Sequence, residues 1–271
     1  MTVYGHISTA LTNHCAFPHT PRLMEKIVIA AHKGGSGKTT VAVNLAGALA
    51  NLGMRVLLVD TDPQGACAAA LGLEPGKPTI YEVLVGQSQR QEAIVGTNVP
   101  GLSLLPSDLD LAGAEVELPK LDDWQQRLKR VLVSLDAVCD LAIIDTPPGL
   151  GVLSFSALSA ATGALVTCPP EFMAFRALPH LQEMTERAGV PLLGIIPTMA
   201  TTTTRHAREV VEQLTEQYTN LVLTAIPRRV ALQDAAIAGL PITSFAPASD
   251  IAERFMALAR EVLRRGKNVA A

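Results

Sequence analysis

The sequence predicts an α/β protein with a doubly wound, mostly parallel sheet and helices on both faces. Short, almost purely apolar runs alternate along the chain with stretches of helical spacing. Such runs are typical of strands buried on both sides, as in a parallel sheet between two helical layers. A glycine-rich loop also joins the first run to the first helical stretch, as at the first strand–helix turn of many doubly wound folds.

Seven apolar runs are predicted as strands because each has four to six residues and no period of two or 3.6. These runs are residues 27–31, 56–59, 102–105, 141–144, 164–167, 192–196 and 221–225.

Five stretches with apolar residues at helical spacing are predicted as helices: residues 39–52, 121–138, 176–188, 205–218 and 250–263. The first ends at Gly53, a residue type that favours helix termination. The last places Ile251, Phe255, Leu258 and Val262 on one face, as expected for a helix that packs inward.

Length and composition limit the class of protein. The chain has 271 residues, of which 48% are hydrophobic and 17% charged, which excludes a mainly disordered chain. The longest apolar runs fall far short of the roughly 18 residues that a membrane-spanning helix needs. We therefore expect a cytoplasmic protein. Its isolated cysteines lack metal-site spacing and are expected to be reduced packing residues; they are Cys15, Cys67, Cys139 and Cys168.

Residues 24–271 contain no linker, repeat or low-complexity tract and are predicted to form one domain. Residues 1–23 lack periodicity and are expected to be a disordered or spurious leader, with translation beginning at Met24. The alternative for this segment is a partner-binding peptide.

The loop KGGSGKTT, residues 33–40, is the strongest chemical signal. Glycines allow the backbone N–H groups to surround phosphates. Lys38 can place its charge on the β- and γ-phosphates, and the Thr39 hydroxyl can bind Mg²⁺. The predicted phosphate-binding residues are Gly34, Gly35, Ser36, Gly37, Lys38, Thr39 and Thr40. An ordinary glycine-rich turn is the weaker alternative, because a strand, a GKT sequence and a helix coincide here.

Carboxylates follow two further predicted strands. The runs VLLVDTDPQG and LAIIDTPPG place Asp60, Asp62 and Asp145 at strand ends. A carboxylate buried there is costly unless it meets a cation or hydrogen-bond donors. A purely structural turn role is an equal alternative for Asp60.

The pattern KGGxGK[ST], with Lys33 before the glycines, is the deviant Walker A motif. With it, the sequence resembles the ParA/MinD family of P-loop ATPases, and most closely the small chromosomal and plasmid partition ATPases of the Soj type. The resemblance extends over about residues 24–263 and includes the stretches PTIYEVLVG, PSDLDLAGAEVEL and AIPRRVALQDAAIAGLPI.

The resemblance implies an ATPase with weak intrinsic activity that uses ATP and Mg²⁺ and closes a homodimer on ATP. Lys33 would reach the nucleotide of the partner subunit, and Asp62 would position the attacking water and help bind Mg²⁺. Asp145 would lie near Mg²⁺, and Pro227 and Arg228 beside the adenine and ribose. The sequence departs from the family in two places. Ala66-Cys67-Ala68 replaces Asn-Ala-Thr and is expected to slow hydrolysis or alter switch contacts, and Arg229 replaces Asn after Pro227-Arg228.

The resemblance also implies non-specific binding to double-stranded DNA and stimulation by a ParB-like centromere-binding protein, and so nucleoid association. The overall charge of −3 gives no general attraction to DNA, but residues 201–271 carry nine basic and seven acidic residues. The candidate DNA contacts are Arg205, Arg208, Arg229, Arg254, Arg264, Arg265 and Lys267. Pairing along a solvated helix, or with the helix dipole, is the alternative for several of them.

Other branches of the family fit less well. A MinD-like membrane switch needs an amphipathic helix beyond the fold, and residues 264–271 are too short for one. Iron-cluster members need a cysteine after the second acidic loop, and residues 149–161 contain none. An ATPase that positions a protein cargo over the nucleoid remains the alternative to DNA partition.

Overall fold

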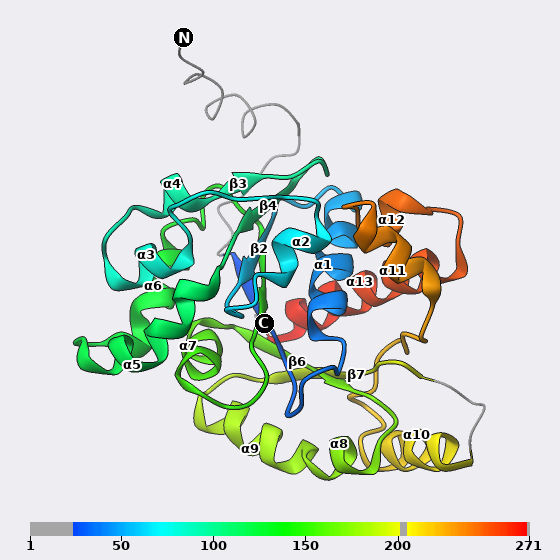
Figure 1. Ribbon diagram of the computed structural model, residues 1–271. Coiled ribbons are helices and arrows are strands. Elements are labelled where there is room, and N and C mark those ends of the chain that lie inside the picture. The colour runs from blue at the N-terminus through cyan, green and yellow to red at the C-terminus, as the bar shows by residue number, and fades with distance from the viewer. Residues whose placement is uncertain (1–23, 201–204, 270–271) are drawn as a thin grey trace.

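The computed structural model describes residues 24–200 and 205–269. Within them, seven strands form one sheet in the order β3-β4-β2-β5-β1-β6-β7 (Figure 1). The parallel strands are β1 (Glu25–Ala30), β2 (Val56–Asp60), β4 (Leu102–Leu105), β5 (Leu141–Asp145), β6 (Gly163–Cys168) and β7 (Leu192–Pro197). The short edge strand β3 (Val95–Gly96) is antiparallel to β4.

Both faces of the sheet are covered because successive strand residues point to opposite sides. Ile27 and Ile29 of β1 pack into one apolar cluster, whereas Val28 packs into another. The first cluster is covered by α1 (Lys38–Asn51), α2 (Ala66–Ala70), α11 (Val230–Ile237), α12 (Ile242–Phe245) and α13 (Asp250–Val269). The predicted doubly wound α/β fold is thereby confirmed.

The second cluster lies under a less regular layer. Its helices are α3 (Ile80–Val85), α4 (Arg90–Ala93), α5 (Ala114–Glu117), α6 (Arg127–Val133) and α7 (Val152–Ala160), with 3-10 turns η1 (Leu109–Gly113), η2 (Leu118–Lys120) and η3 (Trp124–Gln126). Beyond β6, α8 (Phe172–Arg176), α9 (Leu178–Arg187) and α10 (Arg205–Gln217) contribute to a third, smaller apolar cluster.

Two predicted elements are wrong. Residues 221–225 form no strand; Val222 and Ile226 make isolated bridges to Ile195 and Thr198 beside β7. The helix expected at 121–138 is broken, because Asp123 adopts a left-handed φ of 52° and α6 ends at Val133. The other six predicted strands and four predicted helices are present, with shifts of a few residues at their ends.

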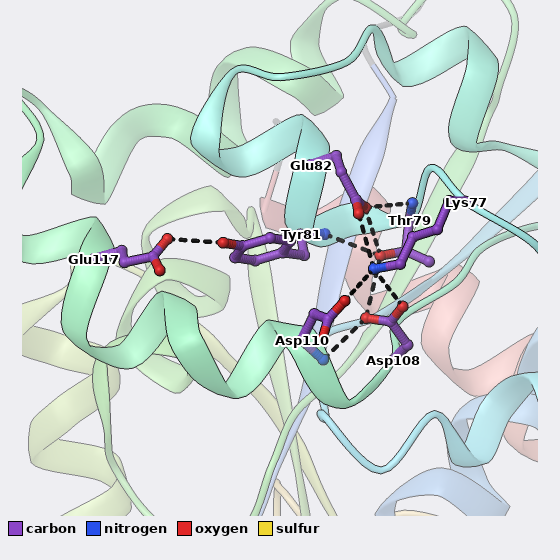
Figure 2. Close-up of polar contacts among 7 residues, drawn as sticks. All are labelled: Lys77, Thr79, Tyr81, Glu82, Asp108, Asp110 and Glu117. Atoms are coloured by element: carbon purple, nitrogen blue, oxygen red, sulfur yellow. Dashed lines mark hydrogen bonds and ion pairs between the residues drawn. The ribbon is translucent and has the colours of Figure 1, made fainter.

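A polar network fixes the start of α3 to η1 (Figure 2). The ammonium of Lys77 contacts Glu82 at 2.8 Å, Asp108 at 2.7 Å and Asp110 at 2.6 Å. Thr79 caps α3 and its backbone N–H donates to Glu82. Although partial burial acts against it, hydrogen bonds from Lys77 and Thr79 lower the pKa of Glu82 to about 2. The network therefore joins residues 77–82 to residues 108–110, two segments that are well separated in the sequence.

The sequence also predicted a leader segment and no membrane-spanning helix. The proposed leader, residues 1–23, lies outside the described residues. Among the residues that are described, no helix has both the length and the apolar character needed to cross a membrane.

Candidate functional site

The glycine-rich loop lies at the carboxyl edge of the sheet, where β1, β2 and β5 are adjacent and parallel. The loops after these three strands therefore meet, as expected for a ligand site in a doubly wound fold. Gly35 and Gly37 have φ of 72° and 86°, a left-handed conformation that favours glycine. Gly37 directly precedes α1, so the loop leads into the N-terminal end of that helix.

Lys38 and Thr39 begin α1 and face the strand-end carboxylates. Lys38 is only 6% exposed, and burial lowers its pKa, whereas the nearby charges of Asp145 and Asp62 act to raise it. The Thr39 hydroxyl donates to Asp145 Oδ2 at 2.6 Å. The loop serine, Ser36, is buried, and its Oγ accepts from Thr167 at 3.2 Å.

Asp60 and Asp145 form a buried pair at the ends of β2 and β5. Burial, together with the proximity of Asp60, raises the pKa of Asp145 to about 7, and burial raises that of Asp60 to about 6. Asp60 accepts from the backbone N–H groups of Asp62 and Cys67 at 2.9 Å and 3.1 Å. These bonds are the contacts expected for the structural alternative, and Asp60 also has a ligand atom within 4.8 Å of those of Cys67 and Asp145.

The donor set fits Mg²⁺. Asp145 Oδ1 is fully buried and has no hydrogen-bond partner among the described residues, so this oxygen has an unused lone pair inside the site. Carboxylate and hydroxyl oxygens are the ligands that Mg²⁺ prefers. Thr39 and Asp145 would hold the ion, which would neutralise charge on the phosphates when bound.

Asp62 is half-buried in the loop after β2. Its Oδ1 accepts from the N–H of Gln64 at 3.0 Å, and its backbone carbonyl accepts from the hydroxyl of Ser107 at 2.5 Å. It lies close enough to influence the pKa of both Lys38 and Asp145. Cys67, one of the departures from the family pattern, places its Sγ 3.6 Å from Asp145 Oδ2.

Lys33 points away from this buried cluster. Its side chain is 62% exposed and its ammonium lies 3.2 Å from Glu171 Oε2, in the loop between β6 and α8. The two lysines of the loop thus occupy different environments, one buried and one at the surface. The sequence did not single out Glu171, because its relation to Lys33 arises from the adjacency of β1 and β6.

Pro227 and Arg228 line an open groove of about 1090 Å³ beside the loop that carries Glu171. Three predicted DNA contacts, Arg208, Arg229 and Arg254, line the same groove. Arg229 is paired with Asp250 at 2.9 Å, and Arg254 donates to the carbonyl of Ala225 at 3.1 Å. The groove therefore gathers four arginines.

The remaining DNA candidates differ in their surroundings. Arg264 is exposed on α13, whereas Arg265 is half-buried and donates to the backbone carbonyl of Leu193 at 2.6 Å. Arg265 is thus used within the fold, where it bonds the backbone of β7. The side chains of Arg205 and Lys267 lie outside the described part of the structure.

Known proteins resemble this chain in both sequence and fold. Residues 24–189 match the sequence profile of a family described as AAA domain, and residues 125–263 match one described as NUBPL iron-transfer P-loop NTPase. The chromosome-partitioning ATPase Soj of Treponema pallidum is 37% identical over 246 residues, which cover 88% of this chain and 97% of that protein.

Solved structures agree. Cobyrinic acid a,c-diamide synthase from Mycobacterium smegmatis, bound to an ATP analogue and magnesium, is 33% identical with a TM-score of 0.77, over 90% of this chain and 96% of that one. A variant of McdA from Cyanothece in complex with ATP is 25% identical with a TM-score of 0.80, over 89% of this chain and 96% of that one. The ligands of these two neighbours, an ATP analogue with magnesium and ATP, agree with the cofactors predicted from the sequence, ATP and Mg²⁺. The chain belongs to the ParA/MinD family of P-loop ATPases and hydrolyses ATP.

Proposed function

We propose that this ATPase segregates chromosomal or plasmid DNA. In this proposal two subunits close on ATP as a sandwich dimer, the dimer binds double-stranded DNA without sequence preference over the nucleoid, and a ParB-like centromere-binding protein stimulates hydrolysis. The chromosome-partitioning name of the Treponema pallidum relative supports the choice of cargo.

The position of Lys33 is the main observation that supports an ATP-dependent dimer. Its ammonium lies at the surface beside Glu171, while Lys38 alone enters the buried cluster. A lysine held outside its own phosphate site is available to a nucleotide on a second subunit. The surface pair with Glu171 is weak, because solvent screens an exposed ion pair to about 0–1 kcal/mol, so closure of the dimer can replace it.

The roles of the other site residues follow from their positions and chemistry. Lys38 and the backbone N–H groups of Gly34 to Thr40 would bind the phosphates, and Thr39 and Asp145 would hold Mg²⁺. Asp62, nearer the surface than Asp145, would position the attacking water. Pro227 and Arg228 would border the adenine and ribose, since they lie on the groove beside the loop.

The proposed DNA surface consists of Arg208, Arg229, Arg254 and Arg264, together with Arg205 and Lys267. A dimer would present each of them twice, and phosphate contacts act collectively. Arg265 is left out of this surface because its guanidinium bonds the carbonyls of Leu193, Leu221 and Val222.

Two lysine variants test the dimer. Lys33→Ala is expected to bind ATP with nearly unchanged affinity but to remain monomeric in light scattering, whereas Lys38→Ala loses ATP binding itself. Asp62→Ala is expected to bind ATP, dimerise and stay on DNA, because hydrolysis would be blocked. An ATP-dependent dimer of Lys33→Ala as stable as that of the unmodified chain would exclude the proposed role of Lys33.

The DNA and partner steps are tested separately. Filter binding to DNA of unrelated sequences should require ATP, and a ParB-like protein encoded beside this gene should raise the rate of ATP hydrolysis. Vesicles of anionic lipid serve as the control, since ATP-dependent co-sedimentation with them would favour a membrane switch instead.

A further inference from the structure

We propose that Glu115 is a positioning residue for ATP hydrolysis, acting through α7 on the loop that follows Asp145. We call residues 61–65 the first switch loop and residues 146–151 the second switch loop. The inference depends on the ATPase activity and not on DNA partition, so its test needs neither DNA nor a partner protein.

Glu115 acts as the N-terminal cap of α7, a helix that lacks a cap of its own. The residue before α7 is Gly151, which has no side chain to accept from the first N–H groups of the helix. Glu115, on α5, accepts from the N–H of Val152 at 2.9 Å and from that of Leu153 at 3.4 Å. A carboxylate at this end of a helix satisfies unpaired donors and interacts favourably with the helix dipole.

The Glu115 carboxylate occupies the space that a side chain at position 151 would need. A Cβ atom on Gly151 would lie 2.7 Å from Glu115 Oε1, closer than carbon and oxygen can approach without a shift. The backbone of Gly151 itself is extended, with φ of −75° and ψ of −172°, and so imposes no need for glycine. A side chain at this position would therefore displace the Glu115 carboxylate from its place beside α7.

The second switch loop connects Asp145 to α7 in six residues. Its first residue, Thr146, donates to the carbonyl of Ile29 at 2.8 Å, which ties that end to β1. At its other end Ser154 of α7 donates to the carbonyl of Gly149 at 3.0 Å. Between them Pro148 passes over the phosphate loop, where a Cβ on Gly34 would lie 3.7 Å from it. The position of α7 thus determines the path of the loop above the phosphates.

The segment that carries Glu115 also contacts the first switch loop. Ser107 donates to the carbonyl of Asp62, and a Cβ on Gly65 would lie 3.1 Å from the carbonyl oxygen of Ser107. This segment, residues 107–115, is also held in place by the contacts of Lys77 with Asp108 and Asp110 (Figure 2). Residues 107–115 therefore contact the first switch loop directly through Ser107 and reach the second through the bonds of Glu115 to the first turn of α7.

Glu115 does not touch the phosphate loop, so its removal should impair the chemical step more than ATP binding. For Glu115→Ala we expect kcat to fall about three- to tenfold while the Kd for ATP changes less than about twofold; tenfold in rate corresponds to about 1.4 kcal/mol. Glu115→Gln, which keeps an acceptor but no charge, should fall in between.

Glu117→Ala is the matched control. Glu117 lies on the same short helix but accepts from the Tyr81 hydroxyl of α3 at 2.9 Å (Figure 2). Its replacement should leave kcat unchanged. Steady-state hydrolysis, ATP titration and thermal unfolding are measured for every variant.

Rescue by a second substitution separates positioning from general damage. Gly151→Ser alone should displace the Glu115 carboxylate, which its Cβ meets, and in the Glu115→Ala background it supplies a side-chain cap for the same N–H groups. We expect the double variant to recover most of kcat. The proposal is overturned if Glu115→Ala keeps full kcat, if kcat and ATP affinity fall together, or if Gly151→Ser brings no recovery.

Discussion

Asp145 illustrates how a site residue can weaken the fold that holds it. It lies fully buried beside Asp60, and one of its oxygens has no hydrogen-bond partner among the described residues. The Thr39 hydroxyl and the charge of Lys38 offset this only in part, since the pKa of Asp145 remains raised to about 7 from an ordinary 3.8. The cluster is better suited to the state with a bound cation than to the free protein.

A dependence of stability on pH follows. A carboxyl group whose pKa is higher in the folded chain binds more protons when folded than when unfolded. Its stabilising contribution is complete below the unfolded value of 3.8 and is lost as pH rises through about 6 for Asp60 and about 7 for Asp145. Without nucleotide, the melting temperature should therefore fall as pH rises from about 4 to about 7, and these two groups should cause no further fall above that.

Asp145→Asn should make the fall in melting temperature smaller. We expect the pH-dependent loss of stability to shrink by at least about 1 kcal/mol, which corresponds to roughly 2 to 4 °C in a domain of about this size. The exposed Asp122→Asn serves as control. Thermal unfolding at several pH values measures the effect, and an unaltered pH profile for Asp145→Asn would contradict the buried-pair account.

At the level of elements, α1 is buried along most of its length, and Gly47 is the point at which α12 approaches it. A Cβ on Gly47 would lie 2.5 Å from Pro241 Cβ. The backbone N–H of Ile242 donates to Asn44 Oδ1 at 2.6 Å, so α12 cannot easily move away. Here close packing, rather than backbone conformation, requires glycine.

Gly47→Ala is therefore expected to lower the free energy of unfolding by about 1–2 kcal/mol, because overpacking outweighs the higher helix propensity of alanine. Gly76→Ala is the control, since a Cβ there meets nothing within 4 Å. Urea unfolding measures both. Equal stability of Gly47→Ala and the unmodified chain would show that α12 can shift.

Elements with a local pattern could be predicted from the sequence, and those fixed by distant contacts could not. The apolar runs of β1, β2 and β5 are each buried on both sides, so their composition alone indicated strands. Residues 221–225 have the same composition, yet they make isolated bridges to β7 in place of a ladder.

The same distinction applies to the site. The phosphate loop and the acidic residues are contiguous motifs, and the sequence revealed them. Ser107, Glu115 and Glu171 contact residues that are distant in sequence: Glu115 and Val152 are 37 positions apart, and Lys33 and Glu171 are 138 apart. Ser107 and Glu115 lie within the stretch PSDLDLAGAEVEL, but no periodicity or spacing in it indicates a contact with the switch loops.

For the whole molecule, the charge distribution decides how DNA could bind. A chain with a net charge of −3 is repelled by DNA on average, so binding must come from a local surface. Arg208, Arg229 and Arg254, which belong to the proposed DNA surface, line one groove, although Glu171 and Glu212 also line it.

The salt dependence of binding tests this surface directly. Each phosphate neutralised by a protein cation steepens the plot of log affinity against log salt concentration by about 0.9. Replacing Arg208 and Arg254 by Ala removes up to four cations from a dimer, so the slope should become shallower by up to about 3.6. The control, Arg130→Ala with Arg187→Ala, removes the same charge from side chains paired with Asp123 and Glu183 on other helices. The affinity for duplexes of unrelated sequence is measured in the presence of ATP, at salt concentrations from about 50 to about 300 mM. If both double variants change the slope equally, only net charge matters; a change confined to Arg208 and Arg254 places the phosphates along the groove.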